Sequence, residues 1–128
     1  MNTEAVIYDV IKEVLPKGSL ETVLFAAVTD TSSETFFYSY FSGEDEPKQC
    51  YQMAEDGQGG MDSGALDKAF EAVTAQIRKS REYQSGKLNI ATLRVDSDRA
   101  VLSMEVYEKK TGLYKIKKEW KKKNLINS

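Results

Sequence analysis

The sequence LETVLFAAVTDTSSETFFYSYF, residues 20–41, contains two runs of strand-forming residues joined by a short polar segment. Leu20–Thr29 is rich in Val, Leu, Phe and Ala, a composition typical of a central strand that is buried on both faces. Asp30–Ser33 consists of residues that favour turns, and Glu34–Phe41 is dense in aromatic residues, which favour strands. We therefore predict an antiparallel hairpin, and we expect the rest of the chain to pack around it.

The second strand of this hairpin has two different aromatic faces, because successive side chains of a strand point to opposite sides. Phe36, Tyr38 and Tyr40 share one face, whereas Phe37 and Phe41 share the other. One of these faces should lie in the core. The other is either covered by a helix or partly exposed as an interaction surface, where tyrosine is a favoured anchor.

Segments on both sides of the hairpin have recognisable patterns. Before it, Thr3–Leu15 has apolar residues at three- and four-residue spacing, which predicts an amphipathic helix that covers one face of the sheet. Pro16 is expected to end this helix. After the hairpin, Gly43–Pro47 predicts a second turn, and Lys48–Ala54 predicts a third, shorter strand.

The middle of the chain combines a glycine-rich segment with the clearest helix. Glu55–Gly64 contains four glycines and three acids, so it is predicted to be a loop, because glycine is costly inside a helix or strand. Ala65–Tyr83 has an apolar stripe at helical spacing, and Asp62 or Ser63 is available as its N-cap.

Two strands and a helix are predicted to complete the chain. Leu88–Val95 and Ala100–Tyr107 are strands around a turn at residues 96–98, and Thr111–Leu125 can form a helix. Short connections between strands favour antiparallel pairing. We predict one α+β domain over residues 1–128, with a roughly five-stranded antiparallel sheet and three packed helices in the order α-β-β-β-α-β-β-α.

Composition limits the chemistry of this domain. The chain has one cysteine, Cys50, and no histidine, so it lacks a zinc-binding pattern and cannot form an intramolecular disulfide. We expect the thiol to be a small buried hydrophobic group within a strand. The N-terminus has no basic, apolar leader and no apolar run is long enough to span a membrane, which predicts a cytoplasmic protein without membrane contact. No cofactor is expected.

Charge is divided between two opposed segments, which the formal net charge of −2 conceals. Residues 30–62 carry eight acids and one base, for a net charge of −7. Residues 109–123 carry eight lysines and one acid, for a net charge of +7. A fold that keeps these segments apart presents an acidic face to a positively charged partner.

The sequence supports catalysis or phosphate binding less well than it supports binding through an acidic face. The neighbouring carboxylates at residues 44–46, 55–56 and 96–98 do not match a metal-binding spacing, and adjacent residues of a turn point in different directions. Gly57–Gly64 lacks the lysine of a phosphate-binding loop and has acidic flanks, so it is either a mobile loop that carries acids to a partner or a plain connector. A Ser–Lys nucleophile stays open, but no local motif indicates one. We do not expect an enzyme.

The lysine-rich segment KKTGLYKIKKEWKKK, residues 109–123, suggests a nucleic-acid contact in which Tyr114 or Trp120 stacks on a base. However, Trp120 shares a helical stripe with Leu113 and Ile116, which favours a place in the core. Residues 1–108 carry ten bases and nineteen acids, a net charge of −9 that repels a polyanion. A solvated basic helix face is therefore the favoured interpretation, with contact to a partner or a second copy left open.

The order of elements resembles that of the YezG-type antitoxin family of small bacterial immunity proteins. The likeness is most specific at the aromatic strand Thr35–Tyr38 and at the closing basic, aromatic helix EWKKKNLI, residues 119–126. This resemblance implies a protein that neutralises a cognate secreted toxin, often a nuclease, by tight protein–protein binding. The family has no catalytic residues, so the resemblance implies none at positions of this chain.

The charge pattern is compatible with this role, because carboxylates can occupy the basic substrate groove of a nuclease in place of phosphates. We hypothesise that the toxin-binding surface consists of six acids and two tyrosine anchors. These are Glu44, Asp45, Glu46, Glu55, Asp56, Asp62, Tyr38 and Tyr40. The alternatives are a general protein-interaction or regulatory module and a nucleic-acid binder that uses the lysine-rich helix, and a homodimer stays open.

Overall fold

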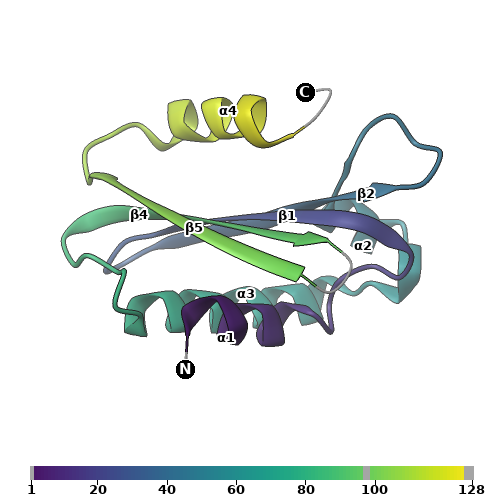
Figure 1. The fold of residues 1–128 in the computed structure, drawn as a ribbon, viewed down its shortest axis with the longest axis horizontal. Coiled ribbons are helices and arrows are strands. Elements are labelled where there is room, and N and C mark those ends of the chain that lie inside the picture. The colour runs from purple at the N-terminus through teal and green to yellow at the C-terminus, as the bar shows by residue number, and fades with distance from the viewer. Residues whose placement is uncertain (1, 97–98, 126–128) are drawn as a thin grey trace.

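Five antiparallel strands form one sheet in the order β3-β2-β1-β4-β5, with helices on both of its faces (Figure 1). The computed structural model describes residues 2–96 and 99–125. Its elements are α1 (Thr3–Ile11), β1 (Ser19–Val28), β2 (Ser33–Phe41), β3 (Lys48–Gln49), α2 (Cys50–Glu55), the 3₁₀ turn η1 (Gln58–Gly60), α3 (Ser63–Lys79), β4 (Lys87–Asp96), β5 (Arg99–Glu108) and α4 (Leu113–Asn124). The predicted α+β fold is confirmed. Ser97 and Asp98, which belong to the predicted turn, lie outside the described residues.

β1 is the central strand, as its composition predicts. It pairs with β2 on one side and with β4 on the other, so that Leu24 lies opposite both Phe37 and Leu93. Every residue from Thr22 to Val28 is buried. Both faces of the strand are covered by helices, which explains why its sequence is apolar without alternation.

Helices α1 and α3 lie next to each other on one face of the sheet (Figure 1). The predicted apolar stripe of α3 is buried against the strands, and one polar residue next to it, Thr74, is buried as well. The buried residues of this helix are Leu66, Ala69, Phe70, Val73, Thr74 and Ile77. Asp62 is the N-cap, because its carboxylate accepts a hydrogen bond from the Ala65 N–H at 2.9 Å.

Both of these helices end earlier than the sequence predicts. α1 ends at Ile11 rather than Leu15 and is followed by a turn. α3 ends at Lys79 rather than at residue 83, because the Ser80 hydroxyl and N–H both donate to the Ile77 carbonyl, at 2.6 and 3.0 Å. A serine that binds the preceding turn in this way competes with continued helix formation.

Helix α4 covers the opposite face of the sheet (Figure 1). The Trp120 ring packs edge-on against Phe25 and Phe36, with ring centroids 5.2 and 5.8 Å apart, and its indole N–H donates to the Thr92 hydroxyl at 2.8 Å. Across the sheet, Phe37 packs against Phe70 of α3. Both aromatic faces of β2 are therefore covered by helices, and the prediction that Trp120 is a core residue is confirmed.

The predicted third strand is wrong beyond its first two residues. β3 comprises only Lys48 and Gln49, and the chain then forms helix α2. The Gln49 side chain caps this helix by accepting hydrogen bonds from the N–H groups of Tyr51 and Gln52, at 2.7 and 3.2 Å. Cys50 and Met53 are three residues apart, so a helix buries both of them, as the structure shows. Cys50 is thus buried as expected, but in a helix.

None of the helices in the described part of the chain combines the length and the apolar character needed to cross a lipid bilayer.

Candidate functional site

The six acids proposed for binding all lie at one end of the sheet. Glu44, Asp45 and Glu46 are in the turn between β2 and β3, whereas Glu55, Asp56 and Asp62 flank the connection from α2 to α3 (Figure 1). We call residues 42–62 the acidic end. This segment contains those six acids and one base, Lys48, for a net charge of −5.

Lys48 joins the two halves of the acidic end. Its ammonium group lies 3.1 Å from the Glu44 carboxylate and also donates a hydrogen bond to the Gln58 side chain in η1, at 3.1 Å. The same group lies 5.8 Å from the centroid of the Phe41 ring. The turn after β2 is therefore tied to the turn after α2, and this contact links the two segments that carry the acids.

The individual carboxylates remain open to solvent. All six acidic residues are exposed. Asp62 is engaged as the N-cap of α3, and Asp56 accepts a longer hydrogen bond of 3.4 Å from the Gln52 amide. They do not converge on a common point, because in the described part of the chain no three acidic, histidine or cysteine residues form a group that could hold a metal ion. The surface can therefore offer distributed negative charge rather than a coordination site.

The two tyrosine anchors lie beside the acidic end rather than within it. Tyr38 and Tyr40 are half-buried residues of β2, on the face that α4 covers. The Tyr38 ring packs edge-on against Phe36, and the Lys121 ammonium of α4 lies 5.8 Å from its centroid. Tyr38 therefore has a structural role in holding α4, whatever its role in binding.

Two acids of the 30–62 segment lie at the opposite end of the sheet, so the expected single acidic face is smaller than the sequence suggests. Asp30 accepts hydrogen bonds from Tyr83, Ser85 and Gly86, and Glu34 forms an ion pair of 2.6 Å with Lys117 of α4. The acidic and lysine-rich segments are thus partly in contact. The reason is that β2 is an extended strand that runs along the sheet from Ser33 to Phe41, so that Glu34 and Glu44 lie at opposite ends of it.

Cys50 is unsuited to nucleophilic chemistry. Its side chain is buried, and burial raises the pKa of the thiol to about 11. The sulfur accepts a hydrogen bond from the Phe37 N–H at 3.5 Å, which holds α2 against β2. A thiol in such a setting stays protonated at neutral pH.

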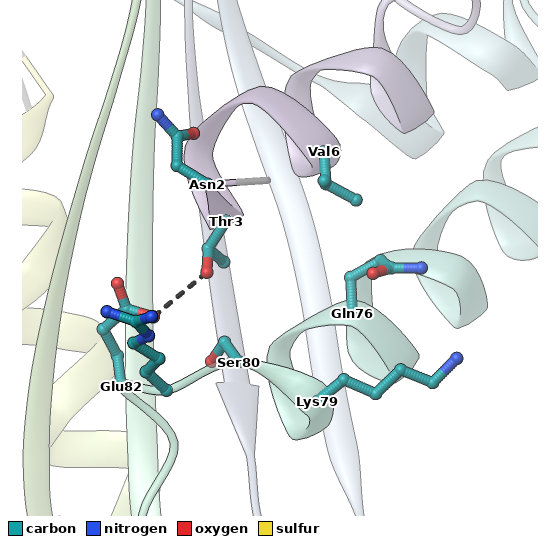
Figure 2. A pocket seen from close by; sticks show the side chains of 8 residues that line it. Asn2, Thr3, Val6, Gln76, Lys79, Ser80 and Glu82 are labelled. Carbon is teal, nitrogen blue, oxygen red and sulfur yellow. Dashed lines mark hydrogen bonds between the residues drawn. The ribbon is translucent and has the colours of Figure 1, made fainter.

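A cavity of about 420 Å³ lies between the start of α1 and the end of α3 (Figure 2). The Thr3 hydroxyl donates to the Glu82 carboxylate at 3.0 Å across its mouth. In Figure 2 the Lys79 side chain extends away from Glu82, so these two charged groups do not converge. The cavity has the character of a polar surface groove.

A second cavity, of about 270 Å³, lies between the edge of β2 and helix α3, and its residues were not singled out from the sequence. It is lined by Ser33, Thr35, Tyr51, Asp67, Phe70, Glu71 and Thr74. The one signal in the sequence is Thr74, a polar residue next to the apolar stripe of a strongly amphipathic helix. Its partners could not be found from the sequence, because they come from three elements.

Comparison of the sequence with models of known protein families and with curated proteins gave no match.

Proposed function

We propose that this protein is an immunity protein, which neutralises a cognate bacterial toxin by binding it through the acidic end. The observation that carries the proposal is the gathering of six exposed carboxylates from two separate segments onto one surface with a single lysine. An arrangement of this kind favours a basic protein surface as the partner.

The proposed toxin is a nuclease. Enzymes that act on nucleic acids bind the phosphate backbone through lysine and arginine, so their substrate groove is positively charged. The carboxylates of the acidic end are distributed over a surface and do not form a metal site among the described residues, as expected for groups that replace phosphates in such a groove. Inhibition by occupation of that groove requires no catalytic residue in the inhibitor.

Long-range attraction suits this role. Complementary charge raises the rate at which two proteins meet, and a lethal enzyme must be captured before it acts. The turn after β2 and the connection after α2 lie at one end of the sheet (Figure 1), and the six acidic residues there are exposed. They are therefore placed to interact with an approaching partner before close contact forms.

Co-expression with the product of the adjacent gene tests the proposal. We expect an affinity pull-down and native mass spectrometry to detect a stoichiometric complex, and we expect the protein to rescue a host that the adjacent gene product poisons. If neither the complex nor the rescue is observed, the protein is better assigned as a general protein-interaction module. Retention on heparin that falls with added salt would instead favour nucleic-acid binding through α4.

A further inference from the structure

The cavity between β2 and α3 has an unusual lining of unpaired polar groups. Thr35 lies on β2 and Thr74 on α3, and the hydroxyl oxygens of both are buried without a hydrogen-bond partner among the described residues. Thr74 is only 6% exposed. Buried polar groups are nearly always hydrogen-bonded, because an unpaired one loses its interaction with water and gains nothing in return. Both threonines line one cavity, so a polar group bound there is placed beside both hydroxyls.

The charged residues that line the cavity are two carboxylates, Asp67 and Glu71, beside the neutral hydroxyls of Ser33 and Tyr51. The Asp67 carboxylate accepts a hydrogen bond of 2.7 Å from the Tyr51 hydroxyl, and burial together with this bond raises the pKa of Tyr51, which keeps it protonated. The Glu71 carboxylate has no ion-pair or hydrogen-bond partner within the part of the chain that the structure describes. No lysine or arginine lines the cavity. The group that fits must therefore donate hydrogen bonds and carry positive charge.

The cavity adjoins a sheet edge without a neighbouring strand. β3 pairs only with Tyr38 and Ser39, so the first half of β2, Ser33–Phe37, pairs with β1 on its inner side but has no strand on its outer side within the described residues. At the end of this stretch the Phe37 N–H donates to the Cys50 sulfur, a weak acceptor, rather than to a strand carbonyl. An edge of this kind can accept an extended peptide through main-chain hydrogen bonds.

We propose that this cavity binds the guanidinium group of an arginine in an extended segment of a partner protein, which lies along the free edge of β2. The guanidinium has five N–H donors in a planar fork, and it can therefore satisfy two hydroxyls and two carboxylates that come from different elements. An ammonium group has three donors on a single atom, so it can form hydrogen bonds with fewer of these acceptors at the same time. This site includes none of the six acids of the acidic end, with which it shares the residue Tyr51, and it does not depend on the identity of a toxin.

The test is a titration followed by amide chemical shifts in the NMR spectrum of the intact protein. The probes are acetyl-Val-Arg-Val-amide, the same peptide with Lys or Gln in place of Arg, and free arginine amide. We expect the arginine peptide to give saturable shifts at Thr35, Asp67 and Thr74, with an affinity about tenfold higher than that of the glutamine peptide, the factor expected for one charge-assisted hydrogen bond. Equal binding of the glutamine peptide would refute a cation site. Equal binding of free arginine amide would refute the role of the β2 edge.

Two variants separate binding from folding. Thr74→Val removes an unpartnered hydroxyl while keeping the shape of the side chain, so we expect an unchanged or higher melting temperature together with about tenfold weaker peptide binding. Glu71→Gln should weaken binding of the arginine peptide without affecting that of the glutamine peptide. The matched controls are Thr31→Val and Glu119→Gln, at exposed positions away from the cavity. Wild-type affinity in both cavity variants would overturn the proposal. So would the absence of chemical-shift changes at the cavity residues with every peptide, which would mean that the cavity holds only water.

Discussion

Asp30 shows how a single exposed residue can join distant parts of the chain. Its carboxylate accepts hydrogen bonds from the Tyr83 hydroxyl and, at 2.9 Å each, from the Ser85 hydroxyl and the Gly86 N–H. The turn between β1 and β2 is thereby fixed to the loop between α3 and β4. These three donors hold the pKa of Asp30 below its ordinary value of 3.8, with the Tyr83 hydroxyl as the main cause.

We predict that Asp30→Asn lowers the stability of the protein more at neutral than at acid pH. The folded-state pKa lies below the value of 3.8 for the unfolded chain, so the ionised group stabilises the native state above that value. This stabilisation is lost as the pH falls through the folded pKa. Urea denaturation at neutral pH should give a clearly lower midpoint for the variant, and the two proteins should converge as the pH falls below the folded-state pKa of Asp30. Glu55→Gln, at an exposed position without this network, is the control and should follow the wild type throughout. An equal loss at all pH values would contradict the assignment.

The buried thiol of Cys50 provides a second prediction for a single residue. Raising its pKa from 9.0 to about 11 lowers the thiolate population at neutral pH by about 100-fold, and burial also blocks access of the reagent. We expect labelling by Ellman's reagent to be at least about 100-fold slower for the native protein than for the protein in urea. The labelling rate in intermediate urea should rise with the unfolded fraction. Rapid labelling of the native protein would show that α2 detaches from β2 without global unfolding.

At the level of whole elements, hydrophobic periodicity predicted the three long helices and four long strands, because each buries a continuous face. The short helix α2 could not be predicted in this way. Residues 50–54 are equally compatible with a strand and with a single helical turn, and the outcome depends on the Gln49 cap and on the fit of Cys50 and Met53 beneath β2. Glutamine is not among the preferred N-cap residues, so its role becomes evident only in the folded structure.

Trp120 is the largest buried side chain that attaches helix α4 to the sheet. Trp120 contacts two aromatic rings and donates a buried hydrogen bond to Thr92, whereas most of the lysines of α4 are exposed. We expect Trp120→Ala to destabilise the protein by about 3–5 kcal/mol, as for other large aromatic residues that are removed from a core. Trp120→Phe retains most of the packing but leaves the Thr92 hydroxyl without its donor, and should cost about 1–2 kcal/mol.

Chemical denaturation monitored by circular dichroism measures both effects, since the variants lack the single tryptophan of the chain. Lys118→Ala, at an exposed position of the same helix, is the control and should change stability by less than about 0.5 kcal/mol. A loss below about 1 kcal/mol for Trp120→Ala would mean that α4 contributes little to the folded state.

For the whole molecule, charge was a better guide to the candidate surface than any motif. The net charge of residues 30–62 indicated an acidic face, and the structure places six of the eight acids at one end. The two others, Asp30 and Glu34, were wrongly grouped with them because a count along the chain does not register that the extended strand β2 separates the two groups of acids. The cavity beside Thr74 was missed for the opposite reason: its polar groups are far apart in the sequence and meet only through packing.

Reversal of charge at the acidic end provides the test at this scale. Glu46→Lys, Glu55→Lys and Asp56→Lys change exposed positions, and lysine near the C-terminus of α2 is compatible with the helix dipole. The triple variant should therefore fold with near wild-type stability. Against the co-purifying toxin, we expect its association rate to fall by about 10- to 100-fold at low ionic strength, with a smaller change in the dissociation rate.

Salt dependence distinguishes long-range attraction from the loss of particular contacts. The association rate of the wild type should decrease steeply with added salt in stopped-flow measurements, whereas that of the triple variant should change little, because screening removes an attraction that the variant no longer has. The control, Asp9→Lys with Glu108→Lys and Glu119→Lys, makes the same change in net charge at exposed positions outside the acidic end. If the control loses as much rate as the triple variant, net charge alone governs association. If neither loses rate, the partner binds elsewhere, and the free edge of β2 becomes the surface to examine next.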